Sequence, residues 1–301
     1  KLIQSEYRQK NQNSSFVADF GFTRNYKSPS SSKKKNINHL FAKLEKNLKL
    51  NNFINSNFNI FYEKVSKDTY LKIFDDNLSI SPIKPKNLDN LNSGFNLLLE
   101  NENYSFYGGA DVFEDLSKGQ SDRYQFVLPY YNFSKNLNPT DYGNFEFSSQ
   151  GDNILDNTNV LKSKIINDIN FKSNDKIINH LGLKNNINVF LKNLNTVGQN
   201  ADEYKSSPQS DLQTLFEINS ELPLLKISDR YDETLIPKIS FKINPGEMKN
   251  HSADERDINV TNIFNTNRLG IDDSLEAGNS LTLGIDYKKE NKIENKNFVQ
   301  F

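Results

Sequence analysis

The stretch LIPKISFKIN, residues 235–244, decides the fold class. Its apolar residues alternate with polar ones, so that Ile239 and Phe241 fall on one face while Ser240 and Lys242 fall on the other. A period of two residues is typical of a β-strand with one apolar and one polar face. The stretch therefore predicts a strand that covers either the core of a soluble sheet or the wall of a membrane barrel.

The same alternation recurs along the whole chain, in about fourteen segments that are mostly about ten residues long. They begin near Leu2, Phe16, Leu40, Ile54, Leu91, Tyr104, Tyr124, Gly143, Val160, Ile187, Leu212, Leu235, Glu276 and Lys296. About ten residues is the length that a tilted strand needs to cross a bilayer. The pattern predicts an all-β chain, an antiparallel transmembrane outer-membrane β-barrel of which about fourteen strands are present.

Two of these segments also have apolar residues at helical spacing. They carry Leu40, Leu44 and Leu48 in one case, and Leu161, Ile165 and Ile169 in the other. Both alternate acceptably as strands. Helices at these places would break the order of short and long connections, so we predict strands.

The connections between segments broadly alternate between short and long. The short ones are residues 10–14, 47–52, 100–103, 136–142 and 289–295, and the long ones are residues 24–37, 64–90, 196–210 and 244–275. Bacterial barrels have short periplasmic turns and longer external loops. A soluble sandwich has no reason to keep this order, so we expect residues 244–275 to form an external loop, folded over the barrel mouth.

Composition narrows the class further. The chain has 301 residues, 37 Lys and Arg against 38 Asp and Glu, and a net charge of -1. This balance gives no basic footprint, so we expect no nucleic-acid partner. Hydrophobic residues make up only 35% although aromatics reach 12%. A thin apolar skin around a wet interior explains this combination better than disorder or a dry core does.

The chain contains no cysteine, which excludes disulfides and cysteine-based metal sites. No signal peptide opens it, and its apolar runs are too short for a transmembrane helix. In a bilayer every backbone polar group needs a partner within the protein, so a sheet must close on itself. We therefore interpret residues 1–301 as one partial outer-membrane β-barrel domain, an internal fragment whose remaining strands are absent.

The sequence offers no catalytic constellation. The three histidines, His39, His180 and His251, are far apart and without metal-ligand spacing, and we expect each to be a polar surface residue. The neighbouring Asp272 and Asp273 are a weak signal for a divalent cation. We expect no enzymatic activity, no cofactor and no metal site.

What remains is transport or binding through a polar lumen. The lumen-facing candidates are Glu100, Glu217, Lys238, Lys242 and Asp286. They mix both signs of charge, so they predict no single-sign filter and suit a large amphiphile's head group or a protein plug. The run of lysines at residues 33–35 is interpreted as part of a solvated loop.

Several stretches resemble the LptD family, whose members insert lipopolysaccharide into the outer leaflet of the outer membrane. The clearest is NIFNTNRLGIDD, residues 262–273, which is similar to a family loop and continues into a glycine-bearing strand. Four others resemble the family in the same order along the chain: SEYR (5–8), VSKDTYL (65–71), VLPYY (127–131) and PKISF (237–241). The best carriers of the loop motif are Asn267, Arg268, Gly270 and Asp272, and we expect them to fold the external loop rather than to contact lipid.

The resemblance implies a lipopolysaccharide-assembly barrel in the outer membrane of a Gram-negative bacterium. It further implies an N-terminal jelly roll that receives lipid from a periplasmic Lpt bridge, an LptE-like lipoprotein plug in the lumen, and a lateral opening between the first and last strands. The chain departs from the family because it has no jelly roll, fewer strands and none of the cysteines that join jelly roll and barrel.

Two other functions stay open on the sequence. A porin-like or nutrient-transport barrel predicts a complete barrel of this length with a loop that constricts the pore. A secreted or surface β-rich binding module predicts a protein that is soluble without detergent.

Overall fold

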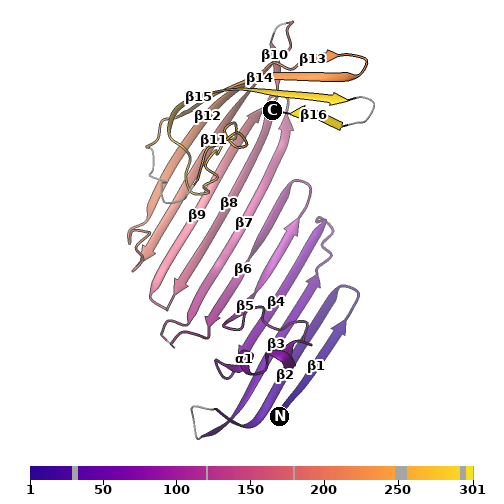
Figure 1. Ribbon diagram of the computed structural model, residues 1–301. Coiled ribbons are helices and arrows are strands. Elements are labelled where there is room, and N and C mark those ends of the chain that lie inside the picture. Colours follow the sequence, from indigo (N-terminus) through magenta and orange to yellow (C-terminus); the bar gives the residue numbers. More distant parts are fainter. Residues whose placement is uncertain (29–32, 120, 179, 248–255, 292–295, 301) are drawn as a thin grey trace. The chain divides into compact units, whose positions relative to one another are not determined.

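A computed structural model describes residues 1–28, 33–119, 121–178, 180–247, 256–291 and 296–300 (Figure 1). The described chain is mostly β-strand, arranged as one antiparallel meander in which the long strands pair in the order of the chain. The all-β, antiparallel part of the sequence prediction is therefore confirmed.

Fourteen strands follow one another in the sheet in the order β1-β2-β3-β4-β5-β6-β7-β8-β9-β11-β12-β14-β15-β16. Their bounds are β1 Leu2–Lys10, β2 Ser14–Lys27, β3 Lys34–Asn47, β4 Asn55–Val65, β5 Asn90–Glu100, β6 Tyr104–Asp115, β7 Tyr124–Thr140, β8 Gly143–Asp156, β9 Val160–Ser173, β11 Leu183–Gln199, β12 Gln209–Glu221, β14 Tyr231–Asn244, β15 Gly278–Asn291 and β16 Lys296–Gln300. Among the described strands, β1 and β16 stand at the two ends of this order, and no described pairing joins them.

Four short elements were not predicted from the sequence. The strands β10 (Lys176–Ile178) and β13 (Leu224–Ile227) pair with β11 and β14, outside the main order. The helices α1 (Tyr70–Ile73) and α2 (Asp75–Leu78) lie in the connection between β4 and β5. Each of the four has only three or four residues, which is too short for a periodicity to be recognised.

The strand prediction needs two corrections. Strands β3 and β9 confirm the choice of strand over helix at the two ambiguous segments. Many strands are longer than expected, however, up to 17 residues in β7 and β11. The expected turn at residues 136–142 is wrong because β7 continues to Thr140. Its polar tail, SKNLNPT (134–140), lacks the apolar alternation by which strands were recognised.

The chain divides into two compact units. Unit 1 comprises Lys1–Lys135, Ser149–Ile165 and Asn195–Gln209, and unit 2 comprises Asn136–Ser148, Ile166–Leu194 and Ser210–Phe301.

In unit 2 the sheet exposes its apolar face and covers its polar face. On β15, Leu281, Leu283 and Ile285 are 61%, 70% and 63% exposed, whereas Thr282 is 5% exposed. The pattern repeats on β12 and β14. There the exposed side chains are Leu212, Phe216, Ile218, Ile239, Phe241 and Ile243, and the buried ones are Gln213, Glu217, Ser240, Lys242 and Asn244. A soluble sheet shows the opposite arrangement, with apolar side chains inside.

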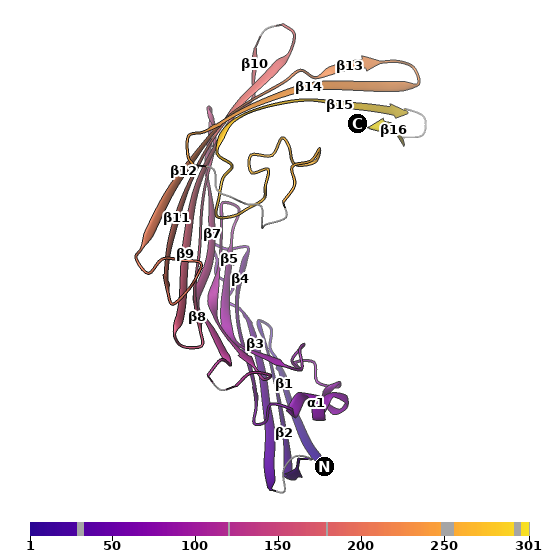
Figure 2. The ribbon, with the colours of Figure 1, turned by 60° about the vertical axis from the view of Figure 1, so that its left-hand side comes forward.

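In unit 1 a small core forms where residues 66–89, with α1 and α2, lie against one face of the first strands (Figure 2). The buried residues of this core are Ile37, Phe41, Val65, Tyr70, Leu71, Leu78, Leu91 and Leu116. On the other face of β2 and β3, Phe20 and Leu40 are exposed. Within the described residues, no helix is both long and apolar enough to cross a membrane.

Candidate functional site

The loop between β14 and β15 folds back on the polar face of unit 2. Its motif residues hold its own shape: Asn267 Nδ2 donates to the carbonyl of Ile271 at 2.8 Å, and Asn267 Oδ1 accepts the Gly270 N–H at 3.0 Å. Gly270 has a φ of +64°, a left-handed conformation that favours glycine. Arg268 forms a two-pronged ion pair with Glu276. The side-chain contacts of Asn267 and Arg268 and the backbone of Gly270 thus lie within the loop itself.

Glu217 of β12 is the centre of the contact between sheet and loop. Its carboxylate accepts hydrogen bonds from Asn188 Nδ2 at 2.7 Å, Ser240 Oγ at 3.1 Å and Thr266 Oγ1 at 3.0 Å. Lys242 Nζ lies 3.3 Å from the same carboxylate. We name these five residues the loop network. Three strands and the loop meet at one carboxylate that is 1% exposed.

Four further bonds attach the loop backbone to side chains of the sheet. Lys242 donates to the carbonyl of Asn265, and Lys192 donates to the carbonyl of Asp272 at 2.6 Å. The remaining two bonds join Asn244 Nδ2 to the Glu276 carbonyl at 3.0 Å and the Leu275 N–H to Gln213 Oε1 at 2.6 Å. Polar groups of the sheet thus satisfy backbone groups of the loop, as burial requires.

A ring and a glycine complete the docking. A Cβ added at Gly284 of β15 would lie 2.7 Å from ring atoms of Phe264, closer than such atoms approach. The missing side chain of Gly284 therefore makes room for the Phe264 ring against the sheet. This explains why β15 carries a glycine at this position of its polar face.

Four of the five lumen-facing candidates lie on the polar face of unit 2. Glu217 and Lys242 are buried in the loop network, and Lys238 forms an ion pair with Asp286 beside them. A cavity of about 430 Å³, partly lined by Glu217 and Lys238, opens next to Thr266. Glu100 of unit 1 is instead at the end of β5, where it accepts a hydrogen bond from Asn55 at 2.8 Å. Residues Asn188 and Thr266 were missed, because only the fold brings them to Glu217.

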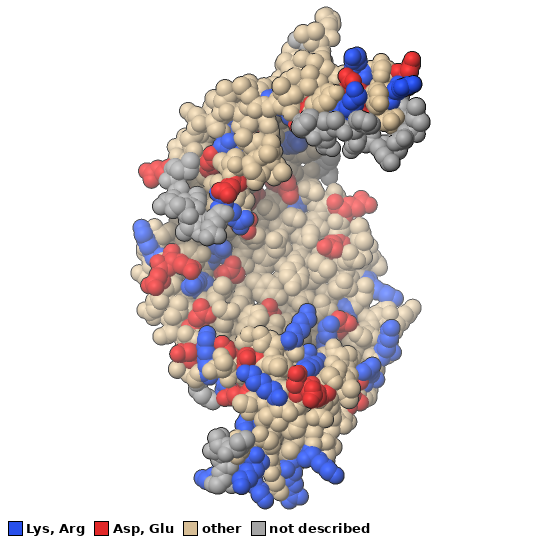
Figure 3. All heavy atoms as spheres, in the orientation of Figure 1, with Lys and Arg blue, Asp and Glu red and all other residues tan. Residues whose placement is uncertain are grey.

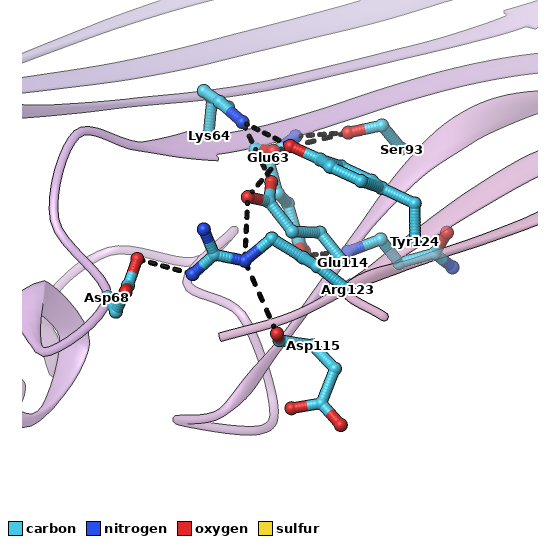
Figure 4. A network of polar contacts seen from close by, with 9 residues as sticks. Glu63, Lys64, Asp68, Ser93, Glu114, Asp115, Arg123 and Tyr124 are labelled. Carbon is cyan, nitrogen blue, oxygen red and sulfur yellow. Dashed lines mark hydrogen bonds and ion pairs between the residues drawn. The ribbon is translucent and has the colours of Figure 1, made fainter. Parts of the chain in front are cut away.

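A second polar cluster occupies unit 1 (Figure 4). Glu114 of β6 accepts hydrogen bonds from Lys64 Nζ at 2.8 Å and Tyr124 OH at 3.1 Å, and Arg123 Nε lies 3.6 Å from it. Arg123 also forms an ion pair with Asp68 at 2.5 Å. The cluster borders a cavity of about 1130 Å³. The cavity lining carries both signs of charge, among them Lys43, Lys84, Arg123, Glu63, Asp122 and Glu203.

His39 does not behave as the sequence suggested. We expected a surface residue, but its ring is buried between Asp19 and Tyr70, with Nε2 3.3 Å from Asp19 Oδ1 and Nδ1 2.9 Å from Tyr70 OH. Because a carboxylate only accepts, the neutral ring donates from Nε2 and accepts the Tyr70 hydroxyl at Nδ1. Burial raises the pKa of the Tyr70 phenol, and the Asp19 charge adds to the shift. These contacts attach the α1 segment to β2 and β3.

The remaining candidates stay apart. His180 is exposed in a turn, and His251 lies outside the described residues. Asp272 contributes its backbone carbonyl to Lys192. In the part of the chain that the structure describes, no group of three or more histidine or acidic side chains could hold a metal ion.

Comparison with known proteins leaves the family undecided. No protein-family model matches this chain, and no curated protein matches it.

Proposed function

We propose that this chain forms part of a β-barrel in the outer membrane of a Gram-negative bacterium, and that it serves lipopolysaccharide transport and assembly as the barrel component of an LptD-like translocon. The observation that carries the membrane part is the exposed apolar face of β12, β14 and β15 together with their buried charges. Such a sheet is stable where the surroundings of its outer face are lipid.

The support for the translocon part is narrower. It consists of the resemblance of residues 262–273 to the family loop, and of the bonds that attach these residues to the polar face of the sheet. An LptE-like lipoprotein plug and a periplasmic Lpt bridge are the partners that the proposal expects. The mixed charges around the unit 1 cavity suit sugars and phosphates together better than ions of one sign.

Photo-crosslinking in living cells tests the cargo. A photoreactive amino acid is placed at Lys238 or Asp286, on the polar face, and at the adjacent Ile239 or Ile285, on the apolar face. The proposal expects adducts with lipopolysaccharide or a small lipoprotein at the first pair, and adducts with bulk phospholipid at the second. Adducts with neither cargo from the polar face, together with ion conductance in a planar bilayer, would favour a porin-like or nutrient-transport barrel instead.

A further inference from the structure

The end of the β2–β3 hairpin is basic. Arg24, Lys27, Lys34 and Lys35 are all exposed there, and residues 20–38 contain no carboxylate. Lys and Arg side chains gather beside the grey residues at the lower end of these strands in Figure 3. We name these four residues the basic hairpin end. In a chain with a net charge of -1, this concentration of one sign is local.

The basic hairpin end extends past the neighbouring strands that the structure describes. The pairing of β1 with β2 ends at Leu2 and Thr23, and the pairing of β3 with β4 ends at His39 and Val65. Beyond these points Asn38 still bonds Ser66, and from Ile37 to the hairpin end the described residues of β3 have β2 as their strand partner, with Lys27 directly opposite Lys34. Like charges opposite each other weaken a strand pair, so this pair is more stable with an anion between its ammonium groups.

The backbone at the hairpin end has a defined β-bulge that a hydrogen bond holds. A β-bulge shifts the register between Thr23 and Tyr26, with Asn25 at a φ of 54°. The Asn25 N–H donates to Asn36 Oδ1 at 3.1 Å, which fixes the bulge. Bulges re-aim side chains. Lys67 adds a further cation, with Nζ 4.5 Å from the ring centre of Tyr26.

Nearby carboxylates are engaged elsewhere. Asp19, farther from the hairpin end on β2, is buried and bound to Gln4 at 2.8 Å and to His39. Asp68, next to Lys67, forms its ion pair with Arg123. Neither carboxylate is placed to neutralise Lys27 or Lys34.

The same two strands carry exposed apolar side chains farther from the hairpin end than the cations. Phe20 is 45% exposed and Leu40 is 41% exposed. Arg24 follows Phe20 by four positions, which is about 13 Å along a strand. An apolar surface with cations at its end matches a lipid, whose acyl chains end in an anionic headgroup. We propose that the basic hairpin end binds the phosphate groups of anionic lipid headgroups at the membrane surface, an inference that rests on the membrane location proposed above.

The experiment measures lipid binding by native mass spectrometry of the whole chain in neutral detergent, with phosphatidylglycerol or phosphatidylcholine as the probe. The test variant combines Lys27→Asn, Lys34→Asn and Lys35→Asn. The matched control combines Lys10→Asn, Lys46→Asn and Lys49→Asn, three exposed lysines at the opposite end of these strands, in β1, in β3 and just after β3. Circular dichroism confirms that both variants keep their sheet.

We expect the chain to prefer phosphatidylglycerol, and the test variant to bind it about tenfold more weakly or worse, since one lysine near an anionic surface contributes about fivefold. The control variant keeps the preference. Equal binding by test variant and unchanged chain overturns the inference, as does displacement of phosphatidylglycerol by dilute inorganic phosphate, which would make free phosphate the ligand. Failure of the unchanged chain to enter neutral phosphatidylcholine vesicles contradicts the membrane location itself, a separate outcome.

Discussion

Glu217 is the residue on which the attachment of the β14–β15 loop to the sheet depends. It is buried, it accepts three hydrogen bonds, and it is the carboxylate nearest to Lys242, which is itself buried. Removing one partner of a buried ion pair leaves an uncompensated charge, which costs far more than losing an exposed pair.

We therefore expect Glu217→Gln to lower the free energy of unfolding by about 3 kcal/mol. The control Glu233→Gln removes an ion pair with Lys289 that is partly exposed, and it should cost less than about 1 kcal/mol. Guanidinium unfolding followed by circular dichroism measures both. Equal effects of the two substitutions would show that the loop network does not hold the loop.

At the residue scale, the contacts of Tyr70 also predict how the stability of the protein depends on pH. Its folded pKa is raised above the ordinary value of 10.0, so the folded protein retains the phenol proton more strongly than the unfolded chain does. The stabilisation is thus fully present below about pH 10 and is lost as the pH rises above that value.

Tyr70→Phe should lower the free energy of unfolding at neutral pH by about 1 kcal/mol, because His39 Nδ1 loses its partner. It should also make the loss of stability above about pH 10 smaller than in the unchanged chain. Unfolding measured across this pH range tests both effects, with Tyr142→Phe, at an exposed tyrosine, as the control. An alkaline loss unchanged by Tyr70→Phe would contradict the assignment.

At the scale of elements, the loop after β14 is held by the packing of Phe264 against Gly284 as well as by ion pairs. A side chain at Gly284 would displace the Phe264 ring. We expect Gly284→Val to release the loop, so that amide hydrogen exchange over residues 258–277 becomes at least about tenfold faster. Gly119→Val is the control, because a Cβ at Gly119 meets nothing within 4 Å. Unchanged exchange in Gly284→Val would mean that Phe264 does not anchor the loop.

The elements show how far sequence reasoning extends. The period of two residues predicted fourteen strands because each long strand repeats it several times, as β12 and β14 do. The short β10, β13, α1 and α2 carry too few residues for a period, and the polar end of β7 has none. The sequence predicted residues 244–275 as an external loop folded over the barrel mouth, which stays a prediction. The contacts that the described residues of this loop make with the polar face depend on strands far apart in the chain.

The candidate site was predicted only in part, because alternation places a residue on one face of its strand but does not identify its partners on other elements. Alternation placed Glu217 and Lys242 on the polar face of their strands, and the structure joins them as an ion pair. Asn188 and Thr266 come from β11 and the loop, and nothing in the local sequence distinguishes them from other polar residues. His39 was misjudged because its burial depends on a segment about thirty residues further along, which supplies Tyr70.

At the scale of the whole molecule, the central claim is that the apolar face of the sheet lies against lipid. Leu283 is the sharpest position for a stability test, since it is 70% exposed. On a lipid-facing strand Leu283→Arg should cost about 2–4 kcal/mol near the middle of the bilayer. At an exposed position in water the same change should stay within about 0.5 kcal/mol. Unfolding from lipid vesicles, with Lys226→Arg as a charged surface control, distinguishes these two cases.

The most direct measurement uses the absence of cysteine in the chain, because a single introduced cysteine then carries a spin label alone. Labels are placed in turn at positions 238–243 of β14 in the chain reconstituted in lipid vesicles, and their collisions with dissolved oxygen and with a water-soluble nickel complex are compared. If the apolar face lies against lipid, oxygen, which concentrates in lipid, reaches labels at Ile239, Phe241 and Ile243 and not those at the intervening positions. Higher nickel access at these three apolar positions, or no alternation along the strand, would contradict it.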